Sequence, residues 1–340
     1  MGKTLIPWGE VVMGLFEYIT SFNRRLAFPW MSTIGLCLTG YKLNEVYLSP
    51  QKHLELAMAM DREFGADFVY PLDNGAILVE TLGLPLLKSD YDFPSTLDNP
   101  VKTLARLAQL PVINPNKDGI IPNYLEALRL ISGHSDKPLA VSVRGHFTLA
   151  VELVGVTDFA RAIIRNPGFV EEVLNYTGRL VSDYVCAVAD AGVRLLCVSE
   201  PTAVILSPER FEKMVGDHLR AIFNRLPEDL WRILHICGDT NYLLPQILKC
   251  GVDGLSLDQI MDFPQVAARL PPDVVLIGNL DPVHVLRELD AVQVREHTLE
   301  LLRSMRGYPN YLFSFGCDCT PDTPFENLKA ALLAVQTEMF

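Results

Sequence analysis

The sequence predicts a single α/β domain, a (β/α)8 TIM barrel preceded by an N-terminal helical extension. The first observation is that eight short apolar segments alternate with longer segments of helical periodicity along the 340 residues, an order typical of a parallel barrel. The second is composition, since 49% of the residues are hydrophobic and the mean hydropathy is +0.20, as expected for strands buried on both faces. No internal repeat, low-complexity tract or linker indicates a second domain.

The predicted strands are short apolar runs, and the predicted helices are longer segments with apolar residues three or four positions apart. The strands span 26–31, 67–72, 138–143, 194–199, 231–236, 253–257, 273–278 and 311–315. The helices span 50–64, 122–132, 168–190, 207–224, 241–249, 290–305 and 324–337. We therefore expect residues 1–45 to form an amphipathic extension that shapes the barrel mouth, and residues 46–340 to form the barrel.

Capping residues support two of these helices. Ser207 precedes Pro208 and an early acidic residue, which is the pattern of a helix start. Thr323 and Pro324 repeat the pattern before the last predicted helix. The segment 84–122 is rich in Pro, Asp and Asn and shows no convincing strand, so we expect it to form an excursion above the barrel.

Charge and hydropathy exclude several classes of protein. The net charge is −12, from 29 basic and 41 acidic residues, whereas nucleic-acid binding depends on a basic surface. Charged residues interrupt the apolar runs before they reach the length of a membrane span, and the first residues do not form a signal peptide. Seven scattered cysteines do not make a disulfide framework. We therefore expect a cytoplasmic protein with neither a nucleic-acid nor a membrane partner.

Polar side chains follow nearly every predicted strand. They are Asp73, Asn74, Arg144, His146, Glu200, His235, Cys237, Asp258, Asn279, Asp281 and Cys317. Active sites of this fold lie at the carboxyl ends of the barrel strands. Since a buried polar group without a partner costs about 1–3 kcal/mol, one such group at nearly every strand end points to function rather than to folding alone.

A zinc site is the strongest chemical prediction from these strand ends. His235 and Cys237 are two residues apart, so an extended strand aims both side chains to one side. One more thiol, from Cys317 or from Cys319 two residues later, completes a set of three ligands. Three protein ligands leave one position of zinc open for water or substrate, which is typical of a catalytic site.

Six segments of the chain resemble one known superfamily. They are 145–149 (Gly-His-Phe-Thr-Leu), 199–201 with 206–208, 235–238 (His-Ile-Cys-Gly), 251–256, 278–282 (Gly-Asn-Leu-Asp-Pro), and 316–317 with 321–327. In this order they resemble the uroporphyrinogen decarboxylase superfamily. Within it, the His-x-Cys and distant Cys resemble the corrinoid-dependent methyltransferases such as the methylcobamide:coenzyme M enzymes. The decarboxylase branch uses no metal and carries an N-terminal Arg-Gln-Ala-Gly-Arg-Tyr motif, which is absent here.

The resemblance implies that His235, Cys237 and Cys317 are the zinc ligands, because the register with the following Pro-x-Thr-Pro segment selects Cys317 over Cys319. The chain departs from the family at His146, where proline is common, and in the first 45 residues. Glu200 is a candidate for a fourth ligand in the resting state, displaced when substrate binds, or for an acceptor that hydrogen-bonds to a ligand; the structural alternative is a rim carboxylate bonded to backbone amides.

Asp258 and Asn279 are two further site candidates. Either residue orients His235 or holds the substrate, since a metal-bound imidazole usually donates its other N–H to such a group. A structural role as a cap after its strand is the alternative for each.

The resemblance further implies a zinc-dependent methyltransferase that moves a methyl group between a corrinoid protein and a zinc-activated small substrate, such as the thiol of coenzyme M. The chain has no Asp-x-His-x-x-Gly cobalamin motif, so methylcobalamin must arrive on a separate partner protein. Three alternatives stay open: the first methyltransferase of a demethylating system acting on a methyl ether, amine or thioether; a uroporphyrinogen decarboxylase-type lyase; and a non-catalytic corrinoid- or tetrapyrrole-binding protein.

Overall fold

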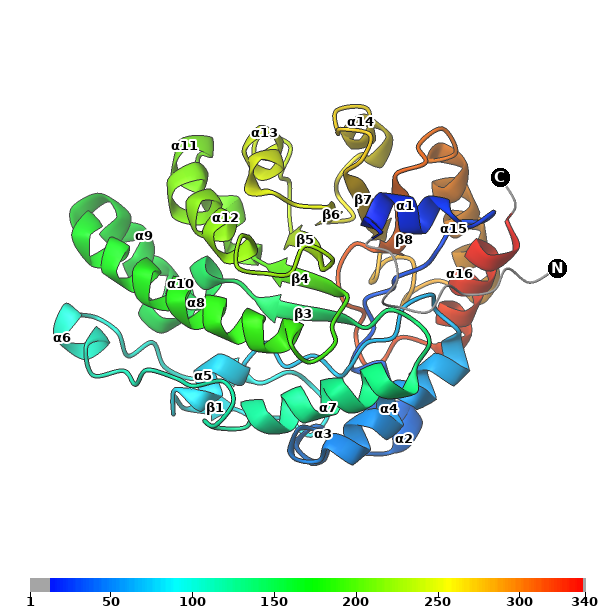
Figure 1. Cartoon of the computed structure of the whole chain (residues 1–340). Helices are drawn as coiled ribbons and strands as arrows, with labels where there is room; N and C mark the ends of the chain where they lie inside the picture. The colour runs from blue at the N-terminus through cyan, green and yellow to red at the C-terminus, as the bar shows by residue number, and fades with distance from the viewer. Residues whose placement is uncertain (1–12, 339–340) are drawn as a thin grey trace.

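The computed structural model describes residues 13–338 and has a parallel barrel sheet at its centre (Figure 1). Six strands pair in chain order from β3 to β8. They are β3 (Ala140–Arg144), β4 (Leu195–Ser199), β5 (Trp231–Ile236), β6 (Gly254–Leu257), β7 (Val275–Leu280) and β8 (Tyr311–Phe315). All five pairings are parallel, so their carboxyl ends lie at one end of the barrel. The predicted fold class is confirmed.

The first two barrel positions are shorter than predicted, yet they close the ring. The expected strands 26–31 and 67–72 are each reduced to a single parallel bridge, one to β8 and one to β3. Pro29 and Pro71 lie inside these segments and lack the N–H that would extend the ladder. The Asp67 N–H donates to the Ala27 carbonyl at 3.1 Å, which joins the two segments and completes the circle.

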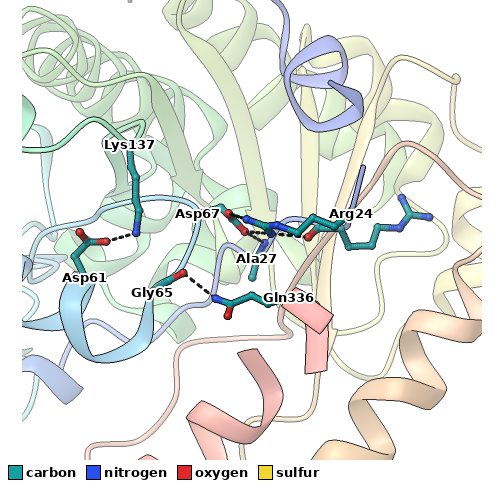
Figure 2. A network of polar contacts seen from close by, with 8 residues as sticks. Arg24, Ala27, Asp61, Gly65, Asp67, Lys137 and Gln336 are labelled. Atoms are coloured by element: carbon teal, nitrogen blue, oxygen red, sulfur yellow. Dashed lines mark hydrogen bonds and ion pairs between the residues drawn. The ribbon is translucent and has the colours of Figure 1, made fainter. Parts of the chain in front are cut away.

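Asp67 stabilises this closure with its side chain as well as its backbone (Figure 2). Its carboxylate accepts the Ala27 N–H at 2.8 Å and pairs with the Arg24 guanidinium. Two further contacts lie around the start of the second barrel segment: the Lys137–Asp61 ion pair and the bond from Gln336 Nε2 to the Gly65 carbonyl at 3.0 Å. The Asp67 side chain therefore supplies part of the stabilisation of the closure that the hydrogen bonds of a longer strand would provide.

The predicted helices form close to their expected bounds on the outside of the barrel (Figure 1). They are α4 (Pro50–Phe64), α7 (Ile121–His134), α10 (Pro167–Ala189), α15 (Ala291–Ser304) and α16 (Phe325–Thr337). Two other predicted helices are divided. The helix predicted over 207–224 consists of α11 (Pro208–Phe211), a π-helical turn (Glu212–Gly216) and α12 (Asp217–Phe223). The helix predicted over 241–249 is reduced to α13 (Leu244–Ile247), which the 3-10 turn Leu248–Cys250 follows.

Several further elements were not predicted. They are α2 (Ile34–Thr39), α3 (Leu43–Leu48), α5 (Ile77–Thr81), α8 (His146–Val154), α9 (Val156–Arg165), α14 (Phe263–Ala267) and the 3-10 turn Pro201–Ile205.

The segment 84–122 contains little regular structure. It holds β1 (Leu86–Leu87), β2 (Ser95–Thr96) and α6 (Leu104–Leu107), and β1 and β2 pair as a two-residue antiparallel ladder. The Val101 N–H donates to the Leu153 carbonyl at 3.0 Å, and the Tyr176 hydroxyl donates to the Pro111 carbonyl at 2.8 Å. The excursion therefore lies against α8 and α10.

Helix α1 (Leu15–Thr20) covers the end of the barrel at which the strands begin. Its Tyr18 ring lies 4.9 Å from the ring of Trp231, the first residue of β5, and Trp231 Nε1 donates to the Met13 carbonyl at 2.9 Å. Inward-facing strand residues pack with α1 in one apolar cluster, which includes Ala140, Leu195, Cys197, Ile233, Ile277 and Leu312. This end is thus filled, so the polar groups gather at the opposite end.

The N-terminal segment is consequently divided between the two ends of the barrel. Helix α1 does not lie at the mouth, because its apolar face packs on the barrel core. Residues 30–32 follow the first barrel position and do reach the mouth. The division into 1–45 and 46–340 stays a prediction, and residues 1–12 lie outside the described part of the chain. No helix within residues 13–338 is long and apolar enough to cross a membrane.

Candidate metal centre

His235, Cys237 and Cys317 meet at the carboxyl ends of β5 and β8. His235 is the fifth residue of β5 and pairs in register with Ser256 of β6. Gly238 takes a φ of +84° directly after Cys237, a conformation that glycine adopts without strain, and so turns the chain at the mouth. Cys317 follows the last residue of β8 by two positions. The parallel sheet therefore brings a local His-x-Cys pair and a distant cysteine to one place.

The potential ligand atoms of these three residues all lie within 4.8 Å of one another. His235 Nε2 is 3.1 Å from Cys237 Sγ, and the two sulfur atoms are 3.8 Å apart. Within residues 13–338 no other group of three or more His, Cys, Asp or Glu side chains converges in this way. One imidazole nitrogen and two thiol sulfurs are a donor set that zinc prefers.

The two thiols share a proton, which separates their acidities. The hydrogen bond from Cys237 lowers the pKa of Cys317, and His235 contributes in the same direction. The same hydrogen bond to Cys317 raises the pKa of Cys237. A thiolate is thus favoured at one sulfur, and a divalent cation between the two would replace the shared proton.

Cys319, the competing third ligand, is held elsewhere. Its thiol lies 3.1 Å from the Trp30 carbonyl, to which its backbone N–H also donates at 3.0 Å. Burial raises its pKa well above the ordinary value. The structure therefore brings Cys317, and not Cys319, to His235 and Cys237.

Glu200 is fully buried and is not among the converging ligand atoms. Its carboxylate accepts the N–H groups of Phe147 and Thr148 at 3.0 and 2.7 Å and the Thr148 hydroxyl at 2.7 Å. His146 Nδ1 lies 3.2 Å from the same carboxylate. Glu200 thus caps the amino end of α8, where backbone N–H groups lack partners within the helix and attract negative charge. This position matches the predicted rim carboxylate bonded to backbone amides.

Gly145 explains why the carboxylate can approach so closely. A Cβ atom at this position would lie 2.2 Å from the carboxyl carbon of Glu200. Glycine is therefore required where α8 begins, since any side chain would displace Glu200 from the amides it accepts.

Asp258 and Asn279 support the loops around the His235, Cys237 and Cys317 cluster, and their hydrogen bonds within residues 13–338 go to backbone groups. Asp258 accepts the Gly238 N–H at 2.8 Å and the Ile260 N–H at 3.0 Å. The Asn279 amide donates to the Asp258 carbonyl at 3.1 Å and to the Met261 carbonyl at 2.8 Å. Asp258 consequently fixes the turn that follows Cys237, and Asn279 fixes the loop that carries Asp258.

Replacing Asp258 by alanine is expected to weaken zinc binding about tenfold, because the turn after Cys237 loses its acceptor. Competition with a chromophoric chelator would measure the affinity. Asp262→Ala is the matched control, since that exposed carboxylate caps α14 in the same loop without contacting the Cys237 turn. Equal affinity in the Asp258 variant and the unchanged protein would contradict this role.

Sequence reasoning missed two residues that lie behind His235. The Ser256 hydroxyl oxygen is 2.9 Å from His235 Nδ1 and accepts the Trp30 indole N–H at 3.1 Å. The sequence offered a weak signal for Ser256, a serine inside the apolar run of β6, and the register of β6 against β5 places it beside His235. The side chain beside His235 Nδ1 is therefore Ser256, whereas Asp258 and Asn279, the residues expected to orient this ring, contact backbone groups.

Asp73 is a further ionisable residue near the mouth of the barrel. Burial raises its pKa to about 6, and the nearby Arg144 partly opposes the shift. Arg144 itself pairs with Glu152. The neighbouring Asn74 is buried, and its side-chain amide has no hydrogen-bond partner among the described residues.

Asp73→Asn is expected to stabilise the fold above pH 6 by about 1–2 kcal/mol. A carboxyl whose pKa is raised in the folded state binds its proton more tightly there, so the fold loses stability as the pH rises from 4 through 6. The neutral amide removes that loss and flattens the profile. Urea unfolding between pH 4 and 8 tests it, with the exposed Glu171→Gln as control, and an unchanged pH profile would contradict the expectation.

Comparison with known proteins identifies the relatives of this chain. A profile described as uroporphyrinogen decarboxylase (URO-D) matches residues 34–338. The uroporphyrinogen decarboxylase of Trichlorobacter lovleyi is 26% identical over 306 residues, covering 88% of this chain and 85% of that protein. The methylcobamide:CoM methyltransferase MtbA of Methanosarcina acetivorans is 29% identical over 292 residues, covering 84% of each. A methyltransferase from Methanosarcina mazei has the same fold, with a TM-score of 0.84 at 23% identity over 95% of this chain and 97% of that one.

Proposed function

The chain belongs to the uroporphyrinogen decarboxylase family, and within that family we propose that it is a zinc-dependent methyltransferase. It would move a methyl group between a corrinoid protein and a small substrate, with a thiol such as coenzyme M as acceptor. The observation that carries this proposal is the convergence of His235, Cys237 and Cys317 within 4.8 Å at the barrel mouth. The methylcobamide:CoM methyltransferases among the relatives support the reaction class.

The residues at the mouth fit zinc in number and charge. Two thiolates and one neutral imidazole balance the charge of a divalent ion. Zinc held by three protein ligands would supply an open position at which a substrate thiol is deprotonated or a methyl donor is polarised. Ser256 contacts the His235 ring, Asp258 holds the turn after Cys237 through the Gly238 N–H, and Glu200 fixes the start of the neighbouring α8.

The methyl carrier is proposed to be a separate corrinoid protein, because this chain lacks a cobalamin-binding motif. Transfer in the opposite sense, from a methyl ether, amine or thioether to the reduced corrinoid, would use the same side chains as the first step of a demethylating system. A cytoplasmic location stays a prediction from the sequence.

A decarboxylase is the second candidate, because relatives with that name are as similar to this chain as the methyltransferases. The absent arginine motif for substrate carboxylates counts against it. A third candidate is a non-catalytic corrinoid- or tetrapyrrole-binding protein, which would catalyse neither methyl transfer nor decarboxylation.

Metal analysis followed by a methyl-transfer assay tests the proposal. We expect about one zinc ion per chain. We also expect the protein to demethylate methylcobalamin when a thiol from a panel that includes coenzyme M is added, and the change in the absorbance of methylcobalamin would measure this reaction. Conversion of uroporphyrinogen with release of CO₂ would support the decarboxylase instead. Purified protein that binds no zinc and demethylates no corrinoid with any thiol would contradict the proposed function.

A further inference from the structure

We propose that residues 30–32, which follow the first barrel position, act together with Ser256 to position the metal ligands. They hold His235 at the end of β5 and Cys317 after β8. The inference rests on the proposed function in one respect, that His235 and Cys317 are metal ligands.

The first half of the argument concerns the orientation of His235. Its Nε2 atom faces Cys237 Sγ at 3.1 Å, and its Nδ1 atom lies 2.9 Å from Ser256 Oγ. A ligand nitrogen needs a free lone pair, so the ring proton belongs on Nδ1 and is donated to Ser256. The hydroxyl oxygen has two lone pairs and can accept this N–H along with a second one.

Trp30 supplies that second donor. The indole N–H can only donate, and it lies 3.1 Å from Ser256 Oγ. It therefore occupies one lone pair of the hydroxyl and leaves the other facing His235 Nδ1. Ser256 is fully buried, so water does not compete for these positions. The three groups form a chain of fixed direction: indole, hydroxyl and imidazole.

The second half of the argument concerns the turn after Cys317. The Trp30 carbonyl accepts the Cys319 N–H at 3.0 Å and lies 3.1 Å from the Cys319 thiol. Two residues on, the Ser32 N–H and hydroxyl donate to the two carboxylate oxygens of Asp318 at 3.2 and 3.1 Å. Residues 30–32 thus hold both residues that follow Cys317. Because Trp30 also donates to Ser256 behind His235, this one short segment connects the two ligands.

Zinc affinity in matched variants tests the proposal without reference to methyl transfer. Ser256→Ala removes the hydroxyl, Ser256→Thr keeps it, and Trp30→Phe removes the indole N–H. Ser314→Ala is the control, because this serine is fully buried in β8 and its hydroxyl has no partner among the described residues. Competition with a chelator would give the dissociation constant, and the visible spectrum of the Co²⁺ form would report the ligand geometry.

We expect Ser256→Ala and Trp30→Phe to weaken zinc binding about 10- to 100-fold and to alter the Co²⁺ spectrum. Ser256→Thr and Ser314→Ala are expected to keep both properties. Should Ser256→Ala fail to fold, Trp30→Phe carries the same test. Equal zinc affinity and spectra in Trp30→Phe, Ser256→Ala and Ser314→Ala would overturn the proposal. A protein that binds zinc with these differences but transfers no methyl group would contradict only the proposed function.

Discussion

Replacing Cys237 by alanine is expected to abolish stoichiometric zinc binding and to lower methyl transfer by roughly 10³-fold. Cys237 is the middle member of the triad, since its sulfur is 3.1 Å from His235 Nε2 and 3.8 Å from Cys317 Sγ. Without it, an imidazole and one thiolate remain, which do not neutralise a divalent ion or hold it at three points. Metal content, and the charge-transfer absorption of the Co²⁺ form, would measure the loss.

The other cysteines provide the comparison that makes this test specific. Cys317→Ala should match Cys237→Ala in both readouts, because its sulfur belongs to the same cluster. Cys319→Ala should keep one zinc per chain, since its thiol lies against the Trp30 carbonyl. Cys186→Ala, on α10, should change neither metal content nor rate. Full zinc occupancy in Cys237→Ala, or loss of zinc in Cys319→Ala alone, would contradict the assignment of the ligands.

The barrel and the metal triad could be predicted because both leave a trace in the order of residues. Apolar strands and amphipathic helices have different periods, and a His-x-Cys spacing on a strand aims two ligands one way. The lengths of the first two barrel segments could not be predicted in the same way. Their composition is that of strands, but Pro29 and Pro71 interrupt the ladder, and Asp67 holds the closure through a side chain.

The residues that support the triad left a weaker trace in the sequence. Trp30 and Ser256 are 226 positions apart, and only the closed barrel places them behind the same imidazole. Asp258 and Asn279 were found as polar strand ends, but their partners are backbone groups of neighbouring loops. A sequence shows which strand end a side chain follows; it does not show toward which neighbour the side chain turns.

Glu200 illustrates the same limit, and its replacement by alanine is expected to destabilise the fold by about 3–5 kcal/mol while leaving zinc binding unchanged. Its carboxylate accepts two backbone N–H groups and the Thr148 hydroxyl. Alanine would leave these donors buried without an acceptor, and each such loss costs about 1–3 kcal/mol. Glu200→Gln keeps one good acceptor oxygen and should lose roughly half as much.

Urea unfolding together with chelator competition separates a capping role of Glu200 from a role as fourth ligand. A capping carboxylate predicts a lower midpoint of unfolding and the same zinc affinity per folded molecule. A fourth ligand predicts the reverse, a weakened metal site in a protein of ordinary stability. The distinction follows from where the carboxylate lies: its partners among the described residues, Phe147, Thr148 and His146, all belong to α8, so the charge of Glu200 already stabilises the start of that helix. Glu171→Ala, an exposed position on α10, controls for the loss of a negative charge.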